Sequence, residues 1–261
     1  MTGWPHLSLE AGGGIGVLRL TREDKRNALD AAMMEALADL CRQVERREDI
    51  GVLILTGSGR SFCAGGDIAA WSAEGPAAFG RHWVRDGHAV LDRLARLRQP
   101  VIAALNGPVL GGGLELAACA DYRIAEDHVR FGQPETGLGI IAGWSGTQRA
   151  VRRFGAQVVR RMALFGEVLS AEEALRAGLA DRVVPQGESL GAARDLAQAL
   201  LKRGPLATEL TKMLVNAAEG EERERVLDAL AGRIAAASDE LQEGVAAFRE
   251  KRPPDFGGRG E

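Results

Sequence analysis

Two glutamates stand out as groups that could transfer protons. Glu115 lies in the first turn of a predicted helix that is otherwise apolar, and Glu135 follows a proline in a segment rich in glycine. A carboxyl group surrounded by leucine and alanine is desolvated, which moves its pKa toward the range useful for acid–base catalysis. Each glutamate alone also has an ordinary interpretation, since Glu115 would stabilise a helix start and Glu135 could be a surface residue.

Two glycine-rich loops could supply the other half of such a site. Residues 62–68 (FCAGGDI) and 106–116 (NGPVLGGGLEL) each follow a predicted strand and lead into a predicted helix. Glycines let backbone N–H groups approach a ligand closely, and two N–H groups from separate loops can form an oxyanion hole. The glycine spacing matches neither a P-loop nor a dinucleotide-binding fingerprint. For either loop alone, the glycines could equally serve only as tight turns.

The elements that must position these loops alternate between strands and helices. The pattern of apolar residues predicts a helix over residues 29–47, with Asp30 as its N-cap. Strands are predicted at residues 15–20, 50–56, 100–105 and 122–125, and helices after them at 170–177, 189–202, 205–218 and 221–248. This order indicates an α/β core followed by a helical C-terminal region, which we place at residues 1–200 and 201–261.

Composition excludes several other classes of protein. No apolar run among the 261 residues is long enough to cross a bilayer, and the N-terminus lacks the pattern of a secretory signal. Cys41, Cys63 and Cys119 are too few for a disulfide framework, so we expect reduced thiols and a cytoplasmic location. The formal net charge of −3 argues against nucleic acid as a partner. No histidine lies in these motifs or has ligand spacing, so no metal is expected.

The motifs together resemble those of the enoyl-CoA hydratase (crotonase) family. The resemblance rests on AGGD at 64–67, GGGLEL at 111–116 and FGQPE at 131–135, and spans roughly residues 14–253. It implies an α/β crotonase (ClpP/crotonase-like) fold, in which a spiral of repeated β-β-α turns precedes C-terminal helices. Those helices would assemble the chain into a trimer or hexamer. The pair of glutamates is what favours a hydratase within the family.

The resemblance also implies a role for each motif. Ala64 and Gly112 match the positions whose backbone N–H groups hold the thioester oxygen, and Glu115 and Glu135 match the acid/base carboxyl groups. The implied reaction adds water across the α,β double bond of a trans-2-enoyl-CoA, which gives a 3-hydroxyacyl-CoA. No separate cofactor is expected, because coenzyme A arrives as part of the substrate. Which glutamate activates water stays open.

Further positions match the family's contacts with coenzyme A. They are Lys25, Arg26, Ala28, Ala64, Gly65, Gly66, Asp67, Ile68, Phe248 and Lys251. Phe248 and Lys251 would reach the coenzyme A of a neighbouring subunit. Lys25 and Arg26 could equally form a solvated turn, and Lys251 a solvated basic C-terminus.

One segment departs from the family pattern. After two isoleucines, family members commonly continue with proline, glycine and small residues, whereas this chain has AGWSG at 142–146. We expect Gly143 and Trp144 to line the acyl pocket, where the indole would favour a short, flat or polar acyl group. The alternative places Trp144 in the core or in a subunit interface.

The same motifs are compatible with other functions within the family. The nearest alternatives are double-bond isomerisation and hydration of an unusual acyl group. An isomerase needs one principal base, so two glutamates favour hydration. A non-catalytic, RNA-associated homologue is a third possibility, but neither a lost glutamate nor a basic patch supports it.

Overall fold

The computed structural model describes residues 4–72 and 75–256. The chain divides into two compact units, Met1–Lys212 and Met213–Glu261. The boundary predicted from sequence, between residues 200 and 201, lies earlier in the chain than the boundary between Lys212 and Met213. Residues 257–261, which belong to the predicted C-terminal region, lie outside the described residues. None of the described helices is long and apolar enough to span a bilayer.

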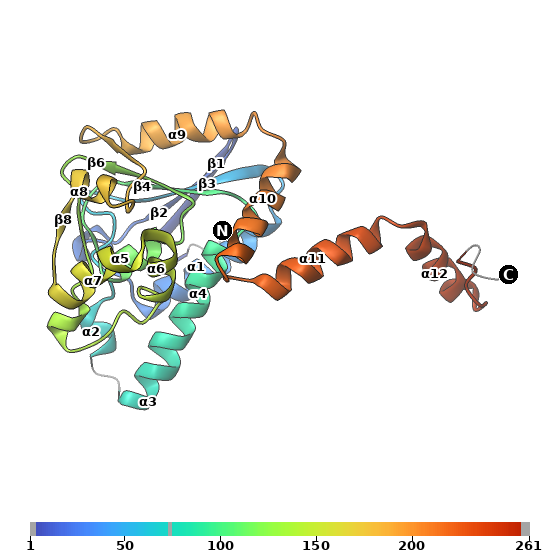
Figure 1. The fold of residues 1–261 in the computed structure, drawn as a ribbon, viewed down its shortest axis with the longest axis horizontal. Coiled ribbons are helices and arrows are strands. Elements are labelled where there is room, and N and C mark those ends of the chain that lie inside the picture. Colours follow the sequence, from blue (N-terminus) through green and yellow to red (C-terminus); the bar gives the residue numbers. More distant parts are fainter. Residues whose placement is uncertain (1–3, 73–74, 257–261) are drawn as a thin grey trace. The chain divides into compact units, whose positions relative to one another are not determined.

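A six-stranded sheet forms the centre of the first unit (Figure 1). Its outer strand β1 (Leu7–Gly12) pairs antiparallel with β2 (Gly14–Leu20). The other strands follow in parallel, in the order β3 (Ile50–Gly57), β4 (Val101–Leu105), β6 (Tyr122–Glu126) and β9 (Arg182–Val184). The four strands predicted from sequence are therefore confirmed, and β1 is an additional one.

Helices cover both faces of this sheet, which explains why its central strands β3 and β4 are almost wholly apolar. Successive side chains of a strand point to opposite faces. Val52 and Ile54 of β3 pack in a cluster with α9 (Ser189–Leu200), whereas Leu53 and Leu55 belong to the larger core. That larger core also contains side chains of α1 (Ala31–Arg46), α4 (Gly87–Ala95) and α5 (Gly112–Ala117).

A smaller sheet completes the predicted β-β-α repeat. It contains β5 (Val109–Leu110), β7 (Arg130–Gly132) and β8 (Leu169–Ser170). Along the chain β4 leads to β5 and α5, and β6 leads to β7, η3 (Glu135–Leu138) and α6 (Gln148–Phe154). After β3, a bridge from Cys63 to Val109 joins the next loop to the small sheet in the same way. The repeat carries the loop after each long strand toward the same place.

The remaining helices include one correction to the sequence-based prediction. The predicted helix over 221–248 is wrong, because α11 (Arg223–Ala236) and α12 (Asp239–Glu250) are separated at Ser238, whose hydroxyl caps α12. Asp30 and Ser170 are N-caps as predicted. The others are η1 (Glu23–Lys25), α2 (Ile68–Trp71), α3 (Pro76–Ala78), the π-helix η2 (Phe79–Asp86), α7 (Ala156–Phe165), α8 (Ala171–Arg176) and α10 (Pro205–Ala218).

A buried asparagine holds the first loop of the site in place. Asn27 has a left-handed backbone, with φ of 56°, and its side chain is fully buried. The amide nitrogen donates to the carbonyl oxygens of Ser58 at 3.0 Å and Ser61 at 2.7 Å, and the amide oxygen accepts from Arg22 N at 2.9 Å. The side chain therefore ties the turn before α1 to the loop after β3.

We expect Asn27→Ala to lower the free energy of unfolding by about 1–3 kcal/mol for each buried carbonyl left without a donor. Urea denaturation followed by circular dichroism would measure this. Ser58→Ala is the matched control, because Ser58 takes part through its backbone carbonyl, which the substitution keeps. Equal unfolding midpoints for the Asn27 variant and the unchanged protein would contradict the proposed clamp.

Candidate active site

A cavity of about 160 Å³ lies where the loops after β3, β4 and β7 meet. Its walls include most of the residues predicted for the reaction and the acyl pocket. Those among its lining residues are Ala64, Gly65, Gly66, Ile68, Gly112, Glu115, Glu135, Gly143 and Trp144. Motifs that are up to 80 residues apart in the sequence thus form one site.

Backbone hydrogen bonds fix the loops that form this cavity. Leu29 N donates to Gly65 O at 2.8 Å, and Asp67 N donates to Leu29 O at 2.7 Å. The second loop is tied to β7 by Gly111 N, which donates to Gly132 O at 3.0 Å. The site is therefore built on segments whose positions follow from the two sheets.

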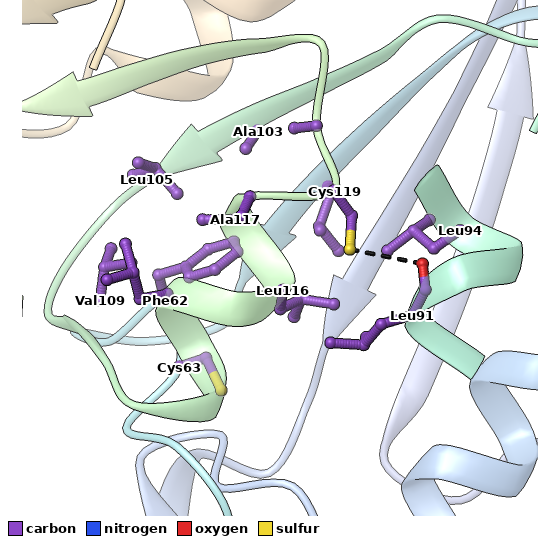
Figure 2. Packing of buried hydrophobic residues seen from close by; sticks show 14 of the residues in the cluster. Phe62, Cys63, Leu91, Leu94, Ala103, Leu105, Val109, Leu116, Ala117 and Cys119 are labelled. Atoms are coloured by element: carbon purple, nitrogen blue, oxygen red, sulfur yellow. Dashed lines mark hydrogen bonds between the residues drawn. The ribbon is translucent and has the colours of Figure 1, made fainter. Parts of the chain in front are cut away.

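Helix α5 carries Glu115 and is buried along its whole length. It begins after Gly111, whose φ of 52° and ψ of −123° suit glycine rather than residues with a side chain. Figure 2 shows Leu116, Ala117 and Cys119 among the apolar side chains around this helix, with Cys119 Sγ donating to Leu91 O of α4 at 3.4 Å. This packing holds the glutamate in one orientation.

Two backbone donors hold the Glu115 carboxyl group. Its Oε1 accepts from Trp144 N at 2.6 Å and from Gly146 N at 2.7 Å, and the residue is only 3% exposed. Burial raises the pKa of Glu115 to about 8, and the nearby charge of Glu135 adds to the rise, while the two N–H donors oppose it. Burial at the apolar cavity is therefore the dominant influence on this group.

Glu135 reaches the cavity from the first residue of η3. Its Oε2 is shielded from solvent, and no donor among the described residues reaches that atom. Burial raises the pKa of Glu135 above its usual range. A β-carbon built on Gly111 would lie 3.1 Å from Glu135 Oε1, so the glycine leaves room for this carboxyl group. Two carboxyl groups thus share one apolar site.

The structure argues against Ala64 as an oxyanion donor and favours Gly66. The Ala64 N–H already donates to Arg26 O at 3.1 Å. Among the described residues, the Gly66 and Gly112 N–H groups donate to no backbone acceptor. A β-carbon built on Gly112 would lie 3.2 Å from Gly66 N, so these two groups approach each other closely.

The residues predicted to contact coenzyme A lie in several different environments. Ile68 is 49% exposed at the cavity, and Lys25 and Arg26 are exposed in the turn before α1. Asp67 is occupied within the protein, since its side chain accepts from Ala69 N at 3.1 Å and pairs with Arg22 at 2.8 Å. Sequence reasoning missed Arg22, which also donates to Ala28 O at 2.9 Å and so joins the two loops.

Phe248 and Lys251 belong to the second unit. Phe248 is 85% exposed, and Lys251 ends α12 with a left-handed φ of 55°. Their contact with the coenzyme A of a neighbouring subunit stays a prediction.

Trp144 lines the cavity and also belongs to the hydrophobic core, so each of the two alternatives from sequence describes part of its surroundings. The residue is 2% exposed, and its indole nitrogen donates to Trp83 O of η2 at 2.7 Å. Sequence reasoning missed Trp71, Phe79 and Trp83, which also line the cavity. Phe79 and Trp83 lie four residues apart on the π-helix η2, a helical spacing that could have indicated a shared apolar face.

Comparisons with known proteins identify the family to which the chain belongs. The family model described as enoyl-CoA hydratase/isomerase matches residues 10–259. The chain is 36% identical to a crotonyl-CoA hydratase of Syntrophomonas wolfei, over 97% of this chain and 98% of that protein. It is 33% identical to an (E)-benzylidenesuccinyl-CoA hydratase of Thauera aromatica, over 97% and 99%. An enoyl-CoA hydratase structure from Bacillus anthracis matches with a TM-score of 0.78 at 31% identity, over 97% and 99%.

The matched residues cover nearly the whole chain and include every motif on which the resemblance rests. The chain therefore belongs to the enoyl-CoA hydratase/isomerase family and has the crotonase fold.

Proposed function

We propose that this protein is an enoyl-CoA hydratase that uses Glu115 and Glu135 as its acid–base pair. The observation that carries the proposal is the meeting of the buried Glu115 carboxyl group, the half-buried Glu135 carboxyl group and two closely placed glycine N–H groups at one small cavity. An isomerase needs one principal base, whereas addition of water requires one group to remove a proton and another to supply one.

The glycine N–H groups supply the electrophilic activation. A thioester oxygen held by Gly66 and Gly112 would draw electron density away from the double bond, which makes the β-carbon electrophilic and the α-carbon enolate-like. Such donors act strongly in a site that excludes water, and loss of one typically costs on the order of 10²–10³ in rate. Glycine is needed at both positions, because a β-carbon would lie 2.8 Å from Trp83 Cζ2 at Gly66 and 2.9 Å from Trp144 Cζ3 at Gly112.

The two carboxyl groups supply the proton transfers. In hydration the oxygen of water bonds to the β-carbon, one carboxylate takes a proton from that water, and the other carboxyl group gives a proton to the α-carbon. This requires one ionised and one protonated glutamate at the same pH. Burial and mutual repulsion favour that state, because they make simultaneous ionisation of both groups costly.

The structural features outside the cavity support two further parts of the proposal. We propose a homo-oligomer, because the second unit exposes large apolar side chains that a subunit contact would cover. They include Leu214, Val215, Ile234, Leu241, Val245 and Phe248. Cys41, Cys63 and Cys119 are buried and belong to no disulfide of the described residues, in keeping with the cytoplasmic location expected from sequence.

We expect Glu115→Gln and Glu135→Gln each to lower kcat for crotonyl-CoA by about 10²–10⁴-fold, the usual contribution of a general acid or base. Loss of absorbance by the conjugated thioester would measure the rate. Glu35→Gln, an exposed position on α1, is the matched control. Unchanged circular dichroism would show that the variants fold, and normal turnover by either folded glutamine variant would exclude the two-carboxyl mechanism.

We expect kcat/KM to fall as pH rises through about 8. The pKa of Glu115 is raised to about 8, so the proton that the pair needs is lost above that pH and not below it. Initial rates between pH 6 and 10, corrected for thioester hydrolysis without enzyme, would give the profile. A rate that stays constant from pH 7 to 10 would contradict the requirement for a protonated glutamate.

A further inference from the structure

The walls of the cavity are unusually aromatic. Aromatic residues make up 5% of the chain but four of the nineteen residues that line the cavity. Three of the four tryptophans of the chain are among them, together with Phe79. Catalysis of hydration accounts for the glycines and the glutamates but not for these rings, so they point to the acyl group.

Contacts among the rings hold them as a fixed surface. The Trp83 and Trp144 rings lie 4.9 Å apart at an angle of 42°, and those of Trp71 and Phe79 lie 5.6 Å apart at 58°. A β-carbon built on Gly87 would lie 2.2 Å from Trp144 Nε1. The indole can therefore pack against the start of α4 only because residue 87 is a glycine. Since Trp144 Nε1 donates to Trp83 O, the only polar atom of this side chain is already paired.

The rings approach the groups assigned to the reaction. A β-carbon built on Gly112 would lie 2.9 Å from Trp144 Cζ3, and one built on Gly66 would lie 2.8 Å from Trp83 Cζ2 and 3.6 Å from Trp71 Nε1. The tryptophans therefore lie beside both proposed oxyanion donors. The acyl carbons nearest the thioester would contact aromatic surface.

The size of the cavity limits what that acyl group can be. A volume of about 160 Å³ is close to that of an engineered protein cavity of roughly 150 Å³ that binds benzene. A group of the size of one ring fits this volume, whereas a long saturated chain would extend beyond it. Aromatic walls also favour a ring over a saturated group of equal size, because the faces and edges of aromatic rings attract one another.

Resting on the proposed hydratase function, we infer that the substrate is an arylpropenoyl-CoA, a trans-2-enoyl thioester with an aromatic ring on its β-carbon. Hydration forms the carbon–oxygen bond at that β-carbon, adds a proton to the α-carbon and converts the double bond to a single bond. Conjugation of the double bond with the ring shifts the hydration equilibrium toward the unsaturated thioester. Dehydration of the 3-hydroxyacyl-CoA, which releases only water, is therefore the more sensitive assay.

The test compares dehydration of four thioesters by the unchanged protein, followed by absorbance of the conjugated product. They are 3-hydroxy-3-phenylpropanoyl-CoA, its 3-cyclohexyl counterpart, 3-hydroxybutanoyl-CoA and 3-hydroxydecanoyl-CoA. The cyclohexyl compound is the matched control, because its ring has the same number of carbons without a flat π-system. We expect the phenyl compound to have the highest kcat/KM, about tenfold above the cyclohexyl compound.

A phenyl value equal to or below the cyclohexyl or butanoyl value would overturn the inference and leave the hydratase function standing. Failure to dehydrate any of the four would overturn both. Trp71→Leu and Trp83→Leu should each lower the phenyl-to-butanoyl ratio of kcat/KM by about fivefold to tenfold. Trp4→Leu, which replaces the tryptophan outside the cavity, should leave that ratio unchanged. An unchanged ratio in both wall variants would also contradict the inference.

Discussion

The close approach of two glycine loops is the constraint on which the site depends. Gly66 and Gly112 come so near each other that a β-carbon on the latter would lie 3.2 Å from the nitrogen of the former. The approach is possible because the loops follow neighbouring parallel strands, β3 and β4, and are joined by the bridge from Cys63 to Val109. It also fixes Glu115, which lies one turn into the helix that starts at Gly112.

Placing two carboxyl groups at an apolar cavity lowers the stability of the folded protein. Two carboxyl groups lie at an apolar cavity, where burial raises the pKa of both. The protein compensates for one of them with N–H donors from Trp144 and Gly146, and leaves Glu135 Oε2 without a donor among the described residues. Complete solvation or pairing of both groups would stabilise the folded state, but it would remove the raised pKa that the proposed reaction requires.

The parts of the fold that could be predicted from sequence depend on local patterns. The buried strands followed from apolar runs, and the starts of α1 and α8 followed from the capping residues Asp30 and Ser170. The break at Ser238 was missed, because alanine and leucine continue on both sides of it. Strand β1 and the helical run from Pro76 to Ala95 were missed although Leu7 and Leu9 alternate in the strand and the apolar residues of the helical run recur at helical spacing.

The limits of prediction at the site have a different cause. The family resemblance predicted that Glu115, Glu135 and Gly112 form the site, and the structure places all three at the cavity. The resemblance assigned the other oxyanion donor to Ala64 and not to Gly66, because the choice depends on which N–H meets the carbonyl of Arg26, a residue almost 40 positions earlier. The aromatic residues that line the cavity were not predicted for a similar reason, since it is the tertiary fold that brings Trp83 of the π-helix η2 beside Trp144.

Infrared difference spectroscopy of a bound thioester tests the central claim most directly, because it reports on the carbonyl itself. Crotonyl-CoA with an isotope-labelled carbonyl carbon would be bound to the Glu135→Gln variant, in which slow turnover preserves the ligand. Two hydrogen bonds from Gly66 and Gly112 should shift the carbonyl band to lower frequency than in free crotonyl-CoA. A bound carbonyl with the same frequency as the free thioester would show that these glycines do not form an oxyanion hole.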